Sequence, residues 1–96
     1  MNMQKEIEQT LRKYKPFLRK KFKVKRIGIF GSFARGEESE KSDIDILVEF
    51  YDPIGWEFFD LKEFLEKILG RQVDLVTVGA LKPHLKDKIL KEAIYA

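Results

Sequence analysis

The chain has 96 residues, of which 36% are charged and 44% are hydrophobic, and its formal net charge is +3 at pH 7. This length suits one domain and not two, so residues 1–96 are predicted to form a single domain. The sequence contains no cysteine, which excludes disulfides and thiolate metal sites. No apolar run approaches the roughly 18 residues of a membrane span, and no signal peptide is visible. We therefore expect a cytoplasmic protein without membrane contact.

The charge is uneven along the chain. Basic residues gather between Lys5 and Lys25, whereas the stretch from Glu37 to Glu66 is mostly acidic. The basic segment is either a solvated helix face or a surface for a polyanion or an acidic partner. A general nucleic-acid binder would be more basic and more continuously so, and nucleic acid is therefore not an expected partner.

The first half of the chain predicts a helix, a strand and a polar connection. Apolar residues from Ile7 to Phe22 recur at helical spacing. Pro16 cannot donate a backbone hydrogen bond, so we expect a kinked helix or two abutting helices. Residues 24–30 (VKRIGIF) predict a strand. Residues 31–42 (GSFARGEESEKS) predict a glycine-bounded connection with room for one helical turn.

The second half adds two strands and two helices. Residues 43–50 (DIDILVEF) and 73–78 (VDLVTV) predict strands. An apolar stripe between Trp56 and Leu69, closed by Gly70, predicts a helix, and residues 81–94 predict a last amphipathic helix. Three short strands need helices on at least one face. The expected fold class is therefore α/β or α+β, a small mixed sheet of about three strands flanked by helices.

A Gly-Ser pair directly follows the first predicted strand. Glycine lets the backbone turn sharply, and successive amides at Gly31 and Ser32 would form a concavity for phosphate oxygens. Arg35 lies close enough in the sequence to assist. The spacing of Gly31 and Gly36 matches a Walker A loop, but that motif needs Lys and then Ser or Thr where Glu37 follows here. The chain is not expected to be a P-loop ATPase.

Carboxylates on two predicted strands form the second candidate feature. Asp43 and Asp45 are two positions apart, so on a strand they project from one face. Two adjacent carboxylates repel each other unless a cation lies between them, and Mg²⁺ is the natural cation. Asp74 is flanked by apolar residues in the third strand, where an ionised group is unfavourable unless it is paired or bound to metal. If the strands are neighbours, these carboxylates could hold two metal ions.

Each feature alone is more often structural. Gly-Ser after a strand is usually a turn, Ser-Asp-x-Asp often caps a strand, and a lone Asp in a strand can face water. Their order along the chain, on correctly placed strands, makes the joint structural explanation much weaker.

The order GSFARG, SDIDILVEF and VDLVT resembles the DNA polymerase β-like nucleotidyltransferase superfamily, whose pattern is Gly-Ser, a spacer, Asp-x-Asp and a later third Asp. The short length, the interrupted first helix and the ending LKPHLKDKILKEAIYA resemble its minimal branch, the MntA-like antitoxins paired with HEPN-domain toxins. No residue of the pattern is missing. The resemblance implies the polymerase β-like fold over nearly the whole chain.

The resemblance also implies residue roles and partners. It places Gly31, Ser32 and Arg35 at the triphosphate of ATP, and it makes Asp43, Asp45 and Asp74 the ligands of two Mg²⁺ ions. Asp74 would also take the proton of the attacking hydroxyl. The implied activity is transfer of AMP to a hydroxyl, in the family a tyrosine of the HEPN toxin, which is thereby neutralised. An assembly with that partner is left open.

Other residues are weaker candidates. His84 is the sole histidine and is expected on the surface of the last helix. Trp56, Phe58 and Phe59 could stack on a base, but we expect packing, for Phe59 in particular. The last helix is expected to pack on the sheet, with docking of a partner as the alternative. Tyr51 and Tyr95 offer hydroxyls for self-modification, on residue type alone.

Two alternative functions remain at the level of sequence. One is nucleotidyl transfer to a small molecule or an RNA end. The other is a non-catalytic binding module that neutralises its partner by contact. The stretch after the third strand leaves little room for a domain that grips RNA or an antibiotic, which favours an acceptor presented by another protein.

Overall fold

A computed structural model describes residues 3–96. The helices and strands follow in the order α1 (Met3–Phe22), β1 (Val24–Phe30), α2 (Gly31–Arg35), β2 (Ile44–Phe50), α3 (Glu57–Leu69), β3 (Val73–Thr77), η1 (Val78–Ala80), α4 (Pro83–Glu92) and β4 (Ile94–Tyr95).

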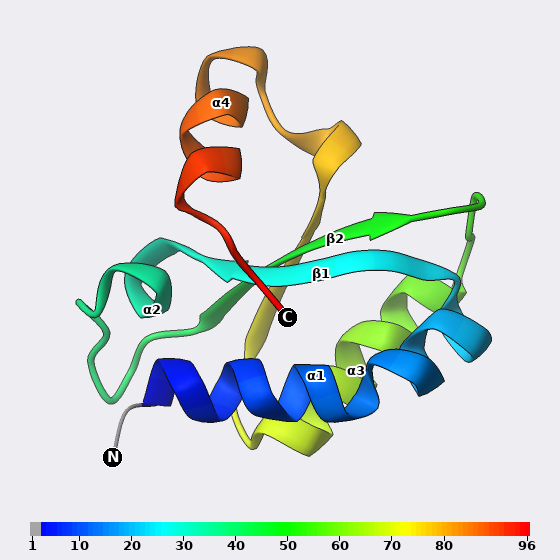
Figure 1. The fold of residues 1–96 in the computed structure, drawn as a ribbon, viewed down its shortest axis with the longest axis horizontal. Helices are drawn as coiled ribbons and strands as arrows, with labels where there is room; N and C mark the ends of the chain where they lie inside the picture. The colour runs from blue at the N-terminus through cyan, green and yellow to red at the C-terminus, as the bar shows by residue number, and fades with distance from the viewer. Residues whose placement is uncertain (1–2) are drawn as a thin grey trace.

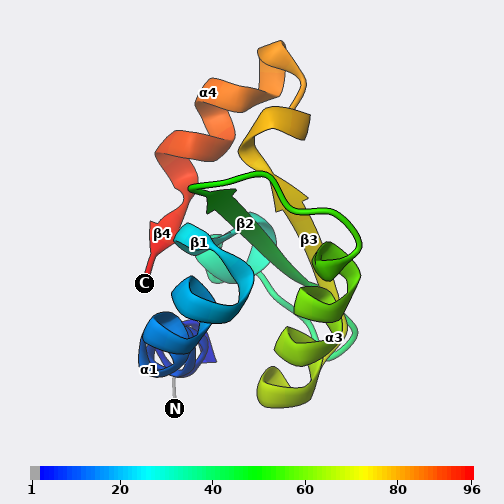
Figure 2. The same cartoon turned by 90° about the vertical axis from the view of Figure 1, so that its right-hand side faces the viewer.

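The strands form one mixed sheet in the order β3-β2-β1-β4 (Figures 1 and 2). β1 pairs antiparallel with β2 and with β4, whereas β2 and β3 are parallel. Parallel neighbours need a crossover connection, and α3 provides it. The predicted α/β class and mixed sheet are confirmed, with four strands in place of about three.

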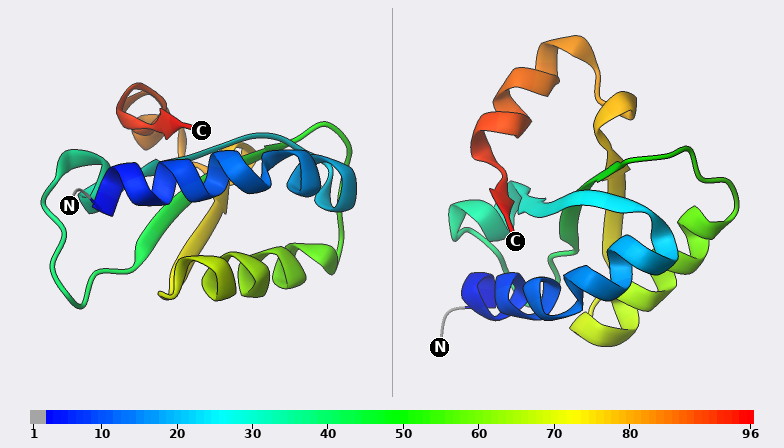
Figure 3. Two further views of the ribbon diagram at one scale, coloured as in Figure 1. Left: turned by 60° about the horizontal axis from the view of Figure 1, so that its bottom comes forward. Right: turned by 45° about the vertical axis from the view of Figure 1, so that its right-hand side comes forward.

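α1 and α3 cover one face of the sheet (Figure 3). Ile44, Ile46 and Val48 of β2 point into the core on this side, because residues two apart on a strand share a face. Leu11 of α1 and Leu61 of α3 are buried against them. The intervening residues of β2 belong to the opposite sheet face, which we call the second face. α4 lies on the side of this face, whereas α2 lies at the end of the sheet where β1 finishes, with Phe33 in the core (Figure 1).

α1 is continuous through Pro16, so the alternative of two abutting helices is wrong. Buried residues flank the proline on both sides, Leu11 before it and Leu18 after it. Their packing holds the two halves in one helix. Pro16 is exposed, so the carbonyl that it leaves without an intrahelical partner can face water.

The last predicted helix is shorter than expected. α4 ends at Glu92 because Ala93 adopts an extended conformation, and Ile94–Tyr95 joins the sheet beside Gly28 and Ile29. The approach is so close that a Cβ on Gly28 would lie 2.6 Å from the Ile94 carbonyl oxygen. A strand of two residues has no periodicity to detect, which explains why the sequence did not predict it.

The expectation that α4 packs on the sheet is wrong. No residue of the helix is buried, and Leu85 is 41% exposed. In Figure 1 the helix rises from the sheet on the side away from α1. His84 is exposed, as predicted. Within residues 3–96, no helix combines the length and apolar character that a membrane crossing requires.

The expectation that Phe59 packs in the core is also wrong. Its side chain is 57% exposed, and Trp56 is 84% exposed. The inward face of α3 is set by Leu61 and Leu65, which are fully buried. Phe59 is two residues from Leu61, or about 200° around the helix, so it points outward. Phe58 is the partly buried aromatic of this turn.

Candidate functional site

Asp45 and Asp74 lie side by side on the second face. They are Cα partners in the parallel pairing of β2 and β3, so their side chains leave the sheet in the same direction. Their neighbours Ile44 and Val73 point into the core and fix this orientation. The predicted convergence of these two carboxylates is therefore present, although 29 positions separate them in the sequence.

The electrostatics of Asp45 reflect this crowding. Burial raises the pKa of Asp45 to about 6, and the charges of Asp74 and Asp43 act in the same direction. A hydrogen bond between the Asp45 and Asp74 carboxyl groups adds to the rise, while the charge of Arg35 opposes it. Two acidic groups and one guanidinium thus act on the Asp45 carboxyl group.

The prediction that Asp43 shares a strand with Asp45 is wrong. β2 begins at Ile44, and Asp43 is the exposed residue before it. Arg71 holds this connection: its Nη1 donates to the carbonyl oxygens of Glu40 at 3.2 Å and Ser42 at 3.3 Å. Asp43 therefore belongs to a loop fixed at its strand end, with more freedom than Asp45.

The Gly31 turn directly adjoins the carboxylates. β1 ends at Phe30, the Cα partner of Asp45, and α2 begins at Gly31. Gly31 has φ of 71°, which favours glycine, and a Cβ there would collide with Oδ2 of Asp45. The turn requires glycine for both reasons, and it lies in van der Waals contact with the Asp45 side chain.

Ser32 and Arg35 lie on the single turn of α2. The Ser32 hydroxyl makes no hydrogen bond to another part of residues 3–96, so it can donate to a ligand. Arg35 Nη1 donates to Oε1 of Glu92 at 2.6 Å, and the Gly31 N–H donates to Oε2 of the same carboxylate at 2.9 Å. The structure therefore brings Gly31, Ser32 and Arg35 together beside Asp45.

The carboxylate pair fits a hard cation that arrives with its own oxygen ligands. In residues 3–96, no set of three or more acidic or histidine side chains is already arranged to enclose a metal ion. Mg²⁺ takes one or two carboxylates and completes its shell with water and substrate phosphates. Asp45 and Asp74 provide such a pair, and a cation bound between them would offset both the burial and the repulsion that raise the pKa of Asp45.

Comparison with known proteins assigns the family. The sequence profile of the nucleotidyltransferase domain matches residues 11–96. The chain belongs to the nucleotidyltransferase family. A protein of Methanocaldococcus jannaschii, provisionally named a protein adenylyltransferase, is 54% identical over 92 residues that cover 94% of each chain. The protein adenylyltransferase MntA of Thermococcus cleftensis is 46% identical over 91 residues, covering 94% of this chain and 92% of its own.

Solved structures agree with this assignment. A structure described as a minimal nucleotidyltransferase superposes with a TM-score of 0.80 at 37% identity, covering 98% of this chain and 95% of its own. A toxin-antitoxin structure with AMP-PNP superposes with a TM-score of 0.67 at 28% identity, covering 99% and 72%. The resemblance to MntA-like minimal nucleotidyltransferases, noted from GSFARG and SDIDILVEF, is confirmed.

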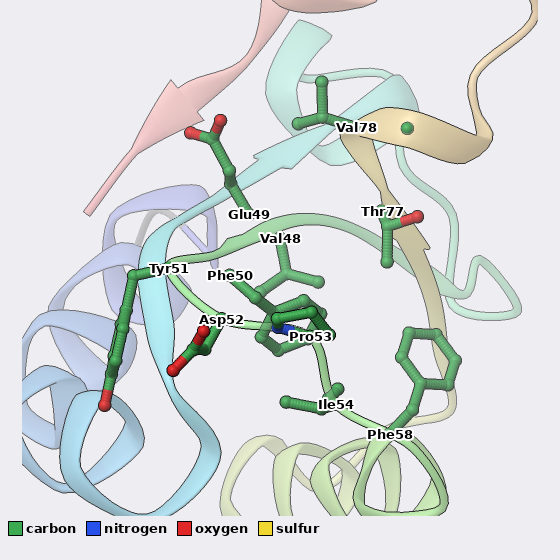
Figure 4. A pocket seen from close by; sticks show the side chains of 11 residues that line it. Val48, Glu49, Phe50, Tyr51, Asp52, Pro53, Ile54, Phe58, Thr77 and Val78 are labelled. Carbon is green, nitrogen blue, oxygen red and sulfur yellow. The ribbon is translucent and has the colours of Figure 1, made fainter.

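A pocket of this nucleotidyltransferase lies away from the carboxylates. It has a volume of about 580 Å³ and is bordered by Val48, Ile54, Phe58 and Thr77, among other residues (Figure 4). It opens at the far end of β2, about 10 Å along the strand from Asp45 at ~3.3 Å per residue. None of the residues predicted for the triphosphate or the metal ions lines it, whereas the weaker candidates Tyr51 and Phe58 do.

Glu92 and Arg71 are the site residues that the sequence did not reveal. Each contacts a residue that is distant in the sequence. Glu92 and its partner Arg35 are 57 positions apart, and Arg71 and its partner Ser42 are 29 positions apart. Neither belongs to a motif, and Glu92 ends a lysine-rich helix where its charge suggests only solvation. Only the folded backbone brings them to the site.

Proposed function

We propose that this nucleotidyltransferase transfers AMP from ATP to a hydroxyl group of a partner protein, a tyrosine of a HEPN-domain toxin, and thereby neutralises that toxin. The observation that carries the proposal is the pairing of Asp45 with Asp74 beside the Gly31 turn. This arrangement provides a cation site next to a phosphate site, as nucleotidyl transfer requires.

The relatives support the finer parts of the proposal. The Thermococcus protein is named a protein adenylyltransferase and MntA, and the solved toxin-antitoxin structure contains an ATP analogue. Both cover nearly the whole of this chain. They favour AMP as the transferred group and a toxin as the acceptor, over a small molecule or an RNA end.

Asp43, Asp45 and Asp74 would hold Mg²⁺, which supplies neutralisation of the triphosphate charge when it is bound. Ser32 and Arg35 would bind the phosphates and align the α-phosphorus. Asp74 is exposed, so an incoming hydroxyl can reach it and give up its proton there. The hydroxyl oxygen forms a bond to the α-phosphorus, and the bond to the bridging oxygen breaks as pyrophosphate leaves with the electron pair.

The test incubates the protein with its co-purified partner, Mg²⁺ and ATP labelled at the α-phosphate. We expect label on the partner, and loss of at least a hundredfold of the rate in Asp45→Asn and Asp74→Asn, because the cation site is removed. Ser32→Ala should lose about fivefold, the value of one hydroxyl contact near 1 kcal/mol. Asp52→Asn, an exposed carboxylate beyond the other end of β2, is the matched control and should retain full rate.

Two results would contradict the proposal. Label that appears only on RNA or a small molecule would identify a different acceptor. Toxin neutralisation that persists in Asp43→Asn and Asp74→Asn would identify a protein that acts by contact alone.

A further inference from the structure

Glu92 makes the contact on which this inference rests. Its two carboxylate oxygens accept one hydrogen bond each, from the Gly31 N–H at 2.9 Å and from Arg35 Nη1 at 2.6 Å. The Glu92 side chain is 16% exposed and that of Arg35 is 44% exposed. The hydrogen bonds from Arg35 and Gly31 lower the pKa of Glu92 against the opposing effect of its burial, which is the largest single influence. Glu92 is therefore a fixed anion at the phosphate-binding turn.

The backbone after Glu92 holds this carboxylate in place. Ile94 and Tyr95 pair with β1, and the Ala96 N–H donates to the Ile27 carbonyl at 2.9 Å. Lys15 Nζ donates to the Ala96 carbonyl at 2.9 Å, which ties the same segment to α1. Among the side chains of α4 (residues 83–92), that of Glu92 makes hydrogen bonds to residues outside the helix. The backbone that carries Glu92 is therefore anchored to the sheet beside the Gly31 turn.

The contact changes which donors remain for a phosphate. The Gly31 N–H has one hydrogen, and Glu92 already accepts it. Arg35 has five N–H donors; Glu92 takes one at Nη1, and Glu37 lies 3.4 Å from Nε. The Nη2 group of Arg35 and the Ser32 hydroxyl are left to face a triphosphate. Gly31 then serves through the shape of its backbone and not through its amide.

We propose that Glu92 is a positioning residue of the triphosphate site, which fixes the Gly31 turn and orients the Arg35 guanidinium so that its remaining donors meet the phosphates. The inference rests on the proposed function, whose ATP site it completes. The opposite role is a carboxylate that occupies the place of a phosphate and must leave before ATP binds. That role predicts an effect of opposite sign.

The experiment measures affinity for a non-hydrolysable ATP analogue with Mg²⁺ by calorimetry. Glu92→Ala should weaken binding about tenfold, because an unrestrained Arg35 must be ordered on binding. Glu92→Gln should weaken it less, since the amide oxygen still accepts a hydrogen bond. Glu37→Gln is the matched control, because Glu37 pairs with the same Arg35 from a side chain that is 64% exposed, and it should stay within about twofold.

A double-mutant cycle and a spectroscopic signal separate positioning from general stability. In the Arg35→Ala background, Glu92→Ala should cause a smaller further loss, because only the part of its effect that passes through the Gly31 turn remains. The resonance of the Arg35 Nη1 group, which donates to Glu92, should be resolved in the wild type and in Glu37→Gln, and should broaden or shift in Glu92→Gln even without nucleotide. Thermal unfolding of each variant identifies any that fails to fold, and Glu92→Gln then replaces Glu92→Ala in the cycle.

Three results would overturn the inference. Tighter binding by Glu92→Ala would show a competing anion. An equal loss with and without Arg35 would show that Glu92 does not act by orienting the Arg35 guanidinium. Unchanged affinity for the analogue in both Glu92 variants would show that Glu92 has no role in the triphosphate site. The proposed function would still stand, because the wild type binds the analogue. If the wild type itself did not bind the analogue, the proposed function and this inference would both fail.

Discussion

Asp45 links the local chemistry of the site to the stability of the fold. Its carboxyl group is half-buried between Gly31 and the charge of Asp74, and its pKa of about 6 lies well above the ordinary value of 3.8. The folded chain therefore binds a proton at this position in a pH range where the unfolded chain has released it. A charged Asp45 opposes folding unless a cation compensates it.

The sign of the resulting pH dependence follows from linkage. Between about pH 4 and pH 6 the folded state holds more protons at Asp45 than the unfolded state, so stability falls as the pH rises through this window. Asp45→Asn removes the ionisation. Without divalent cations, we expect it to be more stable than the wild type at about pH 7, by on the order of 1 kcal/mol after allowance for solvent screening.

Urea unfolding of both proteins in EDTA, at about pH 4 and about pH 7, measures this difference. The gain should be absent at the lower pH, where the wild-type carboxyl is already protonated. Equal stabilities at both pH values would show that Asp45 is well solvated and that its pKa is ordinary.

At the scale of the elements, the sequence predicts most of the strands and the turn between them. Alternation and β-branched residues place β1 at residues 24–30, and Gly31 followed by Ser32 marks the turn after it. These features could be predicted because each depends on neighbouring residues. The partnership of Asp45 with Asp74 could be expected only if β2 and β3 were adjacent, which depends on the path of α3.

What the sequence did not predict depends on contacts between distant segments. β4 exists because Gly28 lets Ile94 approach the sheet, and two residues carry no periodic signal. The outward position of Phe59 follows from the stripe that Leu61 and Leu65 set. An apolar residue type favours the core, but the helix geometry places this one in solvent.

This difference within α3 gives a direct stability test. Leu61→Ala should cost about 2–5 kcal/mol, because it removes a fully buried side chain from a packed core. Phe59→Ser should change stability by less than about 1 kcal/mol, because Phe59 is 57% exposed and contacts mainly Trp56 and Phe58. Chemical denaturation of the two variants and the wild type measures these changes in the free energy of unfolding. A larger loss for Phe59→Ser would mean that the aromatic cluster supports α3.

At the scale of the whole molecule, the sheet separates the basic helix from the candidate site. α1 carries exposed basic side chains, among them Arg12, Lys13, Arg19, Lys20 and Lys21, and it covers the core face of the sheet (Figure 3). Asp45 and Asp74 lie on the second face. The positive charge of α1 is therefore a solvated helix face or a surface for an acidic partner, and it does not contribute ligands to the triphosphate.

Binding of nucleotide with metal should stabilise the whole fold. A ligand at about a hundred times its dissociation constant adds about 2.7 kcal/mol, which raises Tm by roughly 10 °C or more for a domain of this size. We expect this shift with Mg²⁺ and a non-hydrolysable ATP analogue together, and a much smaller shift with the analogue in EDTA. Asp74→Asn should lose most of the shift in differential scanning fluorimetry. A full shift in EDTA would show that the phosphates bind without the carboxylates.

The parallel pairing of β2 with β3 makes the spacing of the chain part of the chemistry. α3 and the short segment Gly70–Gln72 bring Val73 opposite Ile44 and Asp74 opposite Asp45. Deleting one residue from that segment would turn Asp74 toward the core and Val73 toward water, because successive strand residues face opposite ways. A substitution in this connection leaves the register of the two strands unchanged, whereas a change in its length would dismantle the site at a single step.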